Sequence, residues 1–385
     1  MTDTLPTRLP TGAELHTALG RALTTLEEHR AAFTQVFPDD TTQDGRYAPR
    51  AENVGWTTGF STGMFWLAYE HSGDPAFRQS AEAHVASFAE RLKLRADVAH
   101  HDLGFLYTLS CVAAWRLTGN AAARQTALEA AELLHGRFLP RAGIIQAWGN
   151  LDDPRQRGRM IIDCLMNLPL LHWASAETGD VKYREAAVSH VHQAARYLVR
   201  ADASTHHTFF FDPETGTPLH GRTHQGHTDD STWARGQAWG VYGFALNAAL
   251  TGDRTLLEVA RRVADHFLAG LPVDRVPYWD FHFREPSEEP RDSSAAAITA
   301  CGLLVLAEQL PAGEGGAHYR EQGLAMLGSL ARAYAPQPGD DSDALLLHGV
   351  YHRLDNVGVD EGNLWGDYFY LEALTRATRA WQPYW

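Results

Sequence analysis

Two aspartates lie in mostly apolar stretches that would change the acidity of a carboxyl group. Asp102 stands in the run HDLGF and Asp163 in the run IIDCLMN. Apolar surroundings disfavour the charged carboxylate and raise its pKa, which turns one carboxyl of a pair into a proton donor near neutral pH. Capping is the commonest role of Asp at a helix start, but two such residues on neighbouring helices favour catalysis. Asp292 in RDSSAAAI and Asp360 in VDEGNLW are interpreted as caps.

Arginine and tryptophan side chains could complete a sugar-binding site. Arg235 and Trp239 in STWARGQAWG lie one helical turn apart, so the guanidinium could clamp a carboxylate while the indole packs on a sugar ring. An ion pair between helices explains Arg235 equally well. Trp148 and Trp279 are expected in loops, where each is as consistent with packing as with a sugar platform.

The histidines of one long linker do not follow a metal-binding pattern. The sequence has no HExxH motif, no cysteine close to these histidines and no helical i, i+4 pair with a third ligand, so we expect neither a metal nor a cofactor. Histidines in a loop can instead donate hydrogen bonds to substrate oxygens, and ordinary surface residues are the alternative. The residues concerned are His206, His207, His220, His224 and His227, with Gln225 as a neutral donor beside them.

The elements that must position these residues follow from a repeated tripeptide. Each copy stands between an apolar segment such as GQAWGVYGFALNAAL and an amphipathic one such as RTLLEVARRVADHFLAGL. Glycine ends the first helix in a left-handed conformation, and Asp or Asn caps the second. The pattern predicts helical hairpins, each with an interior and an exterior helix. The copies are Ser72-Gly73-Asp74, Thr118-Gly119-Asn120, Thr178-Gly179-Asp180 and Thr251-Gly252-Asp253.

An unpaired helix at each end indicates a closed ring. A fifth pair is expected over 294–335, an unpaired helix over 13–36, and a last interior helix over 364–381. Pairing the first helix with the last gives six hairpins, so we predict an all-α fold, an (α/α)6 barrel (six-hairpin toroid), as a single domain over 1–385. An open solenoid is the alternative, but it would not leave half a pair at each end.

Closure would bring distant residues together at one rim. The interior helices of such a barrel run in one direction, so the residues that precede them must meet around the central cavity. Carboxylates, aromatic rings and an arginine in one rim are typical of a carbohydrate site. The positions are Trp56, His101, Asp102, Asp163, Arg235 with Trp239, Asp292, Asp360 and Glu361.

Composition excludes several other classes of function. The 33 basic and 47 acidic residues give a net charge of −14, which argues against binding to nucleic acid or to an anionic membrane. Cys111, Cys164 and Cys301 are too few and too far apart for a disulfide framework. The N-terminal residues contain no apolar run typical of a signal peptide. We expect a soluble, cytoplasmic protein, and the sequence does not predict its oligomeric state.

Several sequence runs together resemble the unsaturated glucuronyl hydrolases of glycoside hydrolase family 88. The similarity extends from about Trp56 to the C-terminus, and its specificity lies in the set of runs and not in any single one. The sister family of unsaturated rhamnogalacturonyl hydrolases keeps few of them. The runs include GWTTGFSTGMFWLAYEHSGD, HDLGFLYTLS, IIDCLMNLPLLHWASAETGD, LVRADASTHHTFFFDPETG, HQGHTDDSTWARGQAWGVYGFAL, VPYWDF, RDSSAAAI and GVDEGNLWGDYFYLEAL.

The resemblance implies a chemistry that spacing does not show. Such enzymes act on lyase products, whose terminal uronic acid carries a C4=C5 double bond, and they remove that sugar by hydrating the bond. Asp163 would be the proton donor and water activator, and Asp102 would hold substrate hydroxyls and tune Asp163. The other residues that the resemblance places around the sugar are Trp56, His101, Trp148, His207, Gln225, Arg235 and Trp239.

One departure from the family pattern bears on specificity. Members that accept sulfated disaccharides carry serines and a lysine where this chain reads HRLDNV, which places His352, Asp355 and Val357 at the corresponding positions. An aspartate repels a sulfate, and valine removes the cation. Arg353 is a cation that could compensate. We expect a preference for unsulfated substrates of the hyaluronan or chondroitin type.

Three other interpretations stay open at this point. An unsaturated galacturonyl-type hydrolase would act on pectin, gellan or ulvan fragments. A sugar epimerase on the same barrel would need paired histidines across the cavity, and the loop position of His206 and His207 argues against it. A non-catalytic glycan-binding barrel would use the aromatic residues alone.

Overall fold

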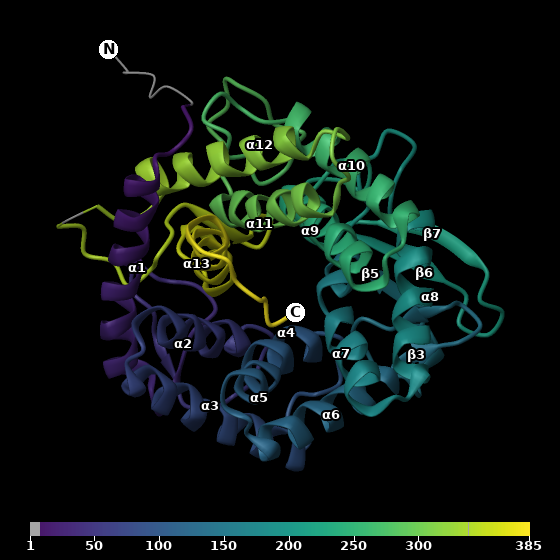
Figure 1. Ribbon diagram of the computed structural model, residues 1–385. Coiled ribbons are helices and arrows are strands. Elements are labelled where there is room, and N and C mark those ends of the chain that lie inside the picture. The colour runs from purple at the N-terminus through teal and green to yellow at the C-terminus, as the bar shows by residue number, and fades with distance from the viewer. Residues whose placement is uncertain (1–7, 338) are drawn as a thin grey trace.

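The computed structural model describes residues 8–337 and 339–385 as two concentric rings of helices (Figure 1). This is the predicted (α/α)6 barrel. The inner ring consists of α2 (Thr58–Ser72), α4 (Leu103–Tyr107) with η1 (Thr108–Val112) and α5 (Ala113–Thr118), η3 (Ile162–Met166) with α7 (Leu168–Thr178), α9 (Ala234–Thr251), α11 (Ser293–Gln309) and α13 (Leu364–Thr378). The outer ring consists of α1 (Gly12–Phe33), α3 (Pro75–Lys93), α6 (Ala121–His135), α8 (Val181–Tyr197), α10 (Arg254–Ala269) and α12 (Gly316–Ser329) with η4 (Leu330–Tyr334).

The apolar pattern of each helix decides its ring. Residues of α9 from Ala234 to Ala248 are all buried, whereas α10 buries only a stripe that includes Leu257, Ala260 and Val263. A helix that is apolar all round must be covered on every side, and a helix with one apolar stripe can face water. The predicted punctuation is confirmed, because the glycine of each tripeptide has a left-handed conformation and the next residue caps the outer helix with its side chain.

The ring is closed by contacts between the two ends of the chain. The last inner helix, α13, packs on α2 as well as on α11, and α1 packs on α13. The two helices are slightly shorter than predicted: α1 ends at Phe33 before strand β1, and α13 ends at Thr378 because Arg379 is extended. None of the helices in the described part of the chain is long and apolar enough to cross a membrane.

Every neighbouring pair of inner helices touches at a glycine. A Cβ atom at Gly104 would lie 2.2 Å from the Cα of Asn167, and one at Gly302 would lie 2.7 Å from the Cα of Tyr242. Real Cβ atoms do not approach backbone atoms so closely, so these glycines set the spacing of the helices. In ring order from α2, the contacts are made by Gly59, Gly104, Gly243, Gly302, Gly366 and Gly63.

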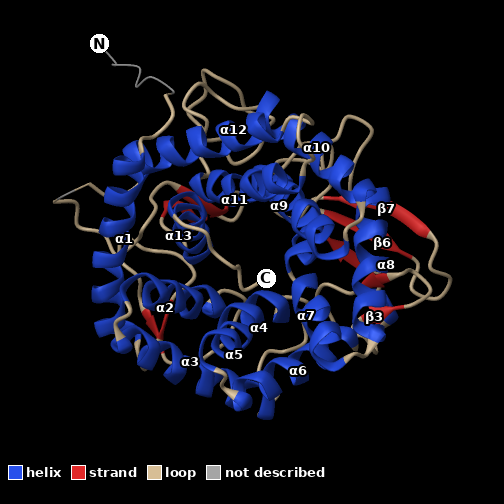
Figure 2. Cartoon of the chain, in the orientation of Figure 1, coloured by secondary structure: helices blue, strands red, loops and turns tan. Residues whose placement is uncertain are grey.

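Short strands form in the linkers that lead from an outer helix to the next inner helix (Figure 2). The long linker between α8 and α9 contributes β6 (Thr208–Phe211) and β7 (Pro218–Arg222) to an antiparallel sheet with β5 (Arg159–Ile161). A hairpin of β8 (Gly349–His352) and β9 (Val357–Glu361) precedes α13. The smaller pairs are β1 (Phe37–Pro38) with β2 (Pro49–Arg50) and β3 (Phe138–Leu139) with β4 (Ile144–Ile145), and η2 (Pro154–Gln156) is a single turn.

The C-terminal residues fill the lumen at the other end of the barrel. Figure 1 shows the C-terminus inside the inner ring. Trp385 is buried, its indole N–H donates to Glu372 at 2.8 Å, and Arg116 at the end of α5 donates to the carbonyl of Pro383. The ring centroid of Trp385 lies 6.2 Å from that of Phe105. The ring centroid of Phe105 lies 5.3 Å from that of Trp239. Aromatic side chains therefore occupy the lumen below the rim.

The glycine contacts predict a specific stability difference. Gly302→Ala would force a carbon against the backbone of Tyr242, and overpacking of this kind lowers the free energy of unfolding by about 1–3 kcal/mol. Gly20→Ala, at an exposed position of α1 with no described atom within 4 Å of the added carbon, should raise it by about 0.5–1 kcal/mol. Urea unfolding of both variants beside the parent protein measures the two changes. An unchanged stability of Gly302→Ala would contradict the close-contact argument.

Candidate active site

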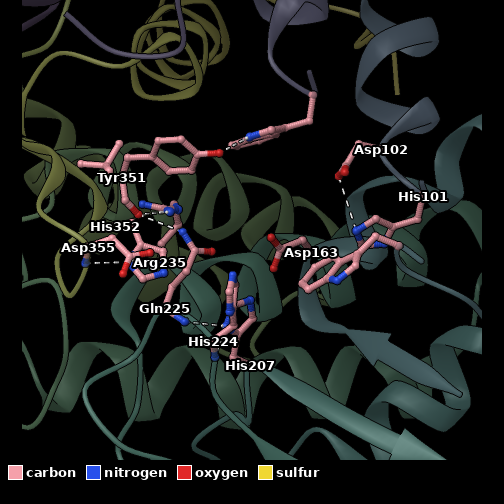
Figure 3. A pocket seen from close by; sticks show the side chains of 13 residues that line it. His101, Asp102, Asp163, His207, His224, Gln225, Arg235, Tyr351, His352 and Asp355 are labelled. Carbon is pink, nitrogen blue, oxygen red and sulfur yellow. Dashed lines mark hydrogen bonds and ion pairs between the residues drawn. The ribbon is translucent and has the colours of Figure 1, made fainter. Parts of the chain in front are cut away.

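A cavity of about 390 Å³ opens at the rim where the inner helices begin (Figure 3). Its wall combines residues that precede α2 and α4, residues of η3 and α9, the linker around β6 and β7, and the β8–β9 hairpin. Acidic, aromatic and basic side chains therefore face one space, although they come from most of the length of the chain. They are Trp56, His101, Asp102, Trp148, Asp163, His207, His224, Gln225, Arg235, Tyr351, His352, Asp355 and Val357.

Asp163 is held in a state that favours the protonated carboxyl. It stands on η3 directly after β5, and its Oδ1 is buried with no hydrogen-bond partner among the described residues. Burial, and next the negative charge of Asp102, together raise the pKa of Asp163 to about 7 against the opposite effect of Arg235. Below pH 7 this side chain consequently carries a proton that no neighbour takes up.

Asp102 is held in the opposite state. Its Oδ2 lies 3.3 Å from Nδ1 of His100 and its Oδ1 lies 3.5 Å from Nε2 of His101. Burial alone would raise the pKa of Asp102, but the neighbouring His101 and His100 lower it below its ordinary value. The two carboxyls thus have pKa values that their surroundings drive apart, which is the arrangement of one ionised group and one proton donor.

Arg235 forms the base of the cavity and is fixed on several sides. Its guanidinium lies between the rings of Trp233 and Trp365, 4.5 and 4.9 Å from their centroids. It donates to the carbonyl of Tyr351 at 2.8 Å and pairs with Asp292 at 3.4 Å. The ion pair between helices is therefore present, and Arg235 also lines the cavity. Its role as a clamp for a carboxylate stays a prediction.

His207 presents a single donor to its surroundings. Its Nδ1 accepts the backbone N–H groups of His224 at 3.0 Å and Gln225 at 3.2 Å. An acceptor cannot carry the proton, so these contacts assign the hydrogen to Nε2. Burial lowers the pKa of His207 well below its usual value, which keeps the ring neutral. A neutral donor of this kind suits a hydroxyl or carboxylate oxygen of a ligand.

Aromatic rings form two walls of the cavity. On one side Trp56 donates from Nε1 to the hydroxyl of Tyr351 at 3.0 Å. On the other side the ring of Trp148 lies 5.7 Å from that of His224 and carries the guanidinium of Arg159 at 4.7 Å. Flat rings on opposite sides of a polar base can hold a sugar between them.

Most of the residues expected around the sugar line this cavity, and Trp239 and Trp279 do not. The linker histidines His206, His220 and His227 and the rim residues Asp292, Asp360 and Glu361 are not among the described lining residues either. Trp239 is one helical turn deeper than Arg235 and is fully buried against Phe105 and Phe369, so its predicted place in the wall is wrong. Trp279 is also outside the described lining residues, and its indole N–H donates to Glu289 at 2.8 Å. Both tryptophans belong to the packing of the barrel.

The two predicted caps have different outcomes. Asp292 caps α11 by accepting the N–H of Ser294, as predicted. The prediction for Asp360 is wrong, because β9 extends through this residue and α13 begins four residues later, at Leu364, with Asn363 as its cap. Asp360 instead pairs with His348 at 2.7 Å.

Tyr351 is the cavity residue that sequence reasoning missed. Its carbonyl accepts hydrogen bonds from both Arg235 and Gln225, the latter at 2.9 Å, and its hydroxyl accepts the one from Trp56. The only sequence signal was its position directly before the HRLDNV stretch.

Within residues 8–337 and 339–385, no group of three or more His, Cys, Asp or Glu side chains could hold a metal ion.

Comparisons with known proteins agree with this architecture. The sequence model of Glycosyl Hydrolase Family 88 matches residues 27–303. The chain is 46% identical over 369 residues to an unsaturated glucuronyl hydrolase from Bacillus sp. strain GL1, covering 96% of this chain and 98% of the relative. It is equally identical to an unsaturated chondroitin disaccharide hydrolase from Streptococcus pyogenes serotype M1, covering 96% and 92%.

Solved structures give the same result. A crystal structure of unsaturated glucuronyl hydrolase from Streptococcus agalactiae superposes with a TM-score of 0.95 at 43% identity, covering 98% of this chain and 95% of that one. A mutant from the same organism, complexed with dGlcA-GalNAc6S, superposes with a TM-score of 0.87 at 41% identity and the same coverage.

The contrast between the two carboxyls predicts how they titrate. Asp102→Asn removes the negative charge that raises the pKa of Asp163, so the midpoint of the Asp163 titration should fall from about 7 towards the ordinary range of a carboxyl. Carbon-13 NMR of labelled aspartate side chains follows this titration directly. Asp355→Asn, which removes a charge at the exposed mouth of the cavity, serves as the control and should leave the midpoint in place. An Asp163 midpoint that does not move in Asp102→Asn would show that the two carboxyls are not coupled.

Proposed function

The chain belongs to glycoside hydrolase family 88, and on this premise we propose that it removes the unsaturated glucuronic acid from the non-reducing end of lyase-generated glycosaminoglycan fragments. The observation that carries the proposal is the protonated, unpartnered carboxyl of Asp163 beside the ionised Asp102. The reaction is the hydration of the C4=C5 double bond, a vinyl ether, and not an attack on the anomeric carbon.

The proposed step needs one proton in and one proton out. Asp163 donates its proton to C4, which leaves positive charge at C5 and the ring oxygen. A water molecule adds to C5, and the ionised Asp163 takes one of its protons, so the carboxyl is restored. The resulting hemiketal opens to a ketone at C5, and C1 then releases the neighbouring sugar as an alcohol. One water is consumed, and the rate should fall as Asp163 loses its proton above pH 7.

The remaining lining residues support binding of a uronic acid. Arg235 supplies positive charge at the base of the cavity, and the N–H of His207 supplies a neutral donor near it. Trp56 and Trp148 provide flat apolar faces for a sugar ring. Asp102, which stays ionised, can accept hydrogen bonds from sugar hydroxyls.

The mouth of the cavity supports a preference for unsulfated substrates. His352, Asp355 and Val357 all line it, which puts a carboxylate and an apolar side chain where a sulfate on the second sugar would approach. Arg353 does not offset this charge, because Glu289 holds its Nε at 3.0 Å. Removal of a sulfate from water is compensated only where a cation receives it.

The histidines do not support the epimerase alternative. Proton exchange at a sugar carbon needs one histidine as acid and one as base. Burial lowers the pKa of His101 to about 4 and that of His207 still further, so both rings stay neutral near pH 7 and cannot act as acids. The second nitrogen of His207 is already occupied by two backbone N–H groups.

The first prediction from this proposal concerns Asp163. The conjugated C4=C5 bond absorbs ultraviolet light and its hydration product does not, so loss of absorbance from unsaturated chondroitin disaccharide reports the reaction. Asp163→Asn should lower kcat by ~10²–10⁴-fold or more and leave substrate affinity nearly unchanged, because only proton transfer is removed. Asp367→Asn is the matched control, since Asp367 is also buried with its pKa raised to about 7 but does not line the cavity, and it should retain kcat within about threefold. Equal losses in both variants would contradict the assignment.

The second prediction concerns sulfate. The parent protein should hydrate the unsulfated disaccharide faster than its 6-sulfated counterpart. Replacing Val357 by Lys together with Asp355→Ser adds a cation and removes an anion, which should improve the ratio of kcat/KM for the 6-sulfated over the unsulfated substrate by about tenfold or more. Val273→Lys, at an exposed position away from the cavity, introduces the same lysine elsewhere on the surface and should leave the ratio unchanged. A parent protein that prefers the 6-sulfated disaccharide would contradict this interpretation of the mouth.

A further inference from the structure

Helix α4 begins at Asp102 but does not use its side chain as a cap. The carbonyl of Asp102 accepts the N–H of Leu106, which makes Asp102 the N-cap residue by its backbone. A capping carboxylate would accept an N–H two or three residues further on, from Gly104 or Phe105. In the described part of the chain no such bond to Asp102 is present, and its φ and ψ of −68° and 5° are not the extended values of an ordinary cap.

The same residue type does cap the other helices of the barrel. Asp74, Asp180, Asp253 and Asp292 each accept the backbone N–H two residues further on, at 2.8–3.1 Å. Asp102 is therefore an exception that needs a physical cause.

That cause lies on the neighbouring inner helix. Oδ1 of Asn167 accepts the N–H of Phe105 at 2.7 Å, and the N–H of Gly104 points to the carbonyl of His101 at 3.4 Å. The N–H groups that Asp102 would otherwise satisfy are thus already paired. Asn167 is fully buried, does not belong to the lining residues of the cavity, and lies four residues after Asp163 at the end of η3.

Close packing and a second hydrogen bond fix the contact between Asn167 and the start of α4. A Cβ atom at position 104 would lie 2.2 Å from the Cα and 2.5 Å from the carbonyl oxygen of Asn167, so the start of α4 sits directly on this residue. Nδ2 of Asn167 also donates to the backbone carbonyl of Asp163 at 3.4 Å. One side chain consequently contacts the backbone next to both cavity carboxyls.

We propose that Asn167 is a positioning residue that caps α4 in place of Asp102 and thereby leaves the Asp102 carboxylate turned towards the cavity and Asp163. The geometry is independent of the reaction, but the use of turnover as a readout rests on the proposed function. Without Asn167, the N–H of Phe105 loses its partner in the barrel interior, and an unpaired buried donor is costly. The Asp102 carboxylate is then the neighbouring acceptor, and it should turn to cap the helix.

Capping of α4 by the Asp102 carboxylate would change how the reaction rate depends on pH. A carboxylate bound to the start of α4 no longer faces Asp163, so the negative charge that raises the pKa of Asp163 in addition to burial is withdrawn, and the rate should begin to fall at a lower pH. The variant also removes the hydrogen bond of the Asn167 side chain to the Asp102 carboxylate, which helps to lower the pKa of Asp102. The charged groups in this region do not change in the variant. The titratable and charged side chains around Asp102 are His100 and His101 from its own loop, Asp163 and Cys164 from η3, Arg91 from α3, Arg137 after α6, and Tyr351 from β8.

The test compares Asn167→Ala with a matched buried asparagine. Asn247 is also fully buried between inner helices and donates to the carbonyls of Leu165 and Gly243, but among the described residues it makes no hydrogen bond to α4. Both variants should unfold at lower temperature. Only Asn167→Ala should lower kcat on the unsaturated disaccharide, by about 10–100-fold, and move the alkaline limb of the rate to lower pH. A limb that stays in place in Asn167→Ala, or one that moves equally in Asn247→Ala, would overturn the proposal.

A double variant tests whether Asn167 affects turnover through Asp102. If Asn167 acts through Asp102, Asn167→Ala should cost little further turnover in an Asp102→Asn background, and an undiminished second loss would overturn the proposal. Should Asn167→Ala fail to fold, Asn167→Asp keeps an acceptor oxygen for the N–H of Phe105. It should retain turnover well above that of Asp102→Asn, and a loss equal to Asp102→Asn would overturn the proposal.

The proposed function can fail without this inference. If the parent protein hydrates no unsaturated disaccharide, carbon-13 NMR of the aspartates still decides the matter. The Asp163 midpoint should fall in Asn167→Ala and stay in place in Asn247→Ala. Equal midpoints in the two variants would overturn the positioning role.

Discussion

The close approach of the inner helices is the constraint on which the rest of the structure depends. Glycines at each interface let neighbouring helices approach closely, with backbone against backbone at Gly59, Gly104 and Gly302, and side chains there would push the helices apart. Because the ring is tight, the starts of six helices converge on one small space. A cavity with two carboxyls, an arginine and aromatic walls is the result of this convergence, and no single segment of the chain contains enough of it to bind a ligand.

The chemical asymmetry of the site comes from where the barrel places charge. Asp163 is buried, and its Oδ1 has no hydrogen-bond partner in the described structure, which favours the protonated form of this carboxyl. Asp102 lies next to two histidine rings, which favour the ionised form of its carboxyl. The two residues are alike in type and in apolar sequence context. They differ because the two histidines that directly precede Asp102 in the sequence lower its pKa, whereas Asp163 has no such neighbour and is raised by burial and by the charge of Asp102 from another helix.

Much of the barrel could be predicted from sequence because its signals are local. A glycine followed by Asp or Asn marks four of the six hairpins, and these caps appear where the pattern puts them. Depth within a helix is not a local signal, and Trp239 was consequently misplaced by one turn. Asp360 was misassigned because a strand intervenes before α13, and Tyr351 was missed because its partner Arg235 is 116 residues away.

The aromatic side chains that fill the lumen determine how a substrate can enter the barrel and how products can leave it. Phe105, Trp239 and Trp385 block the axis below the cavity, so the barrel is a cup and not a tunnel. A polysaccharide cannot thread through it, and only a chain end can reach the carboxyls. Both products of the proposed reaction must leave by the opening through which the substrate came. The product that occupies the cavity must therefore leave before the next chain end can enter.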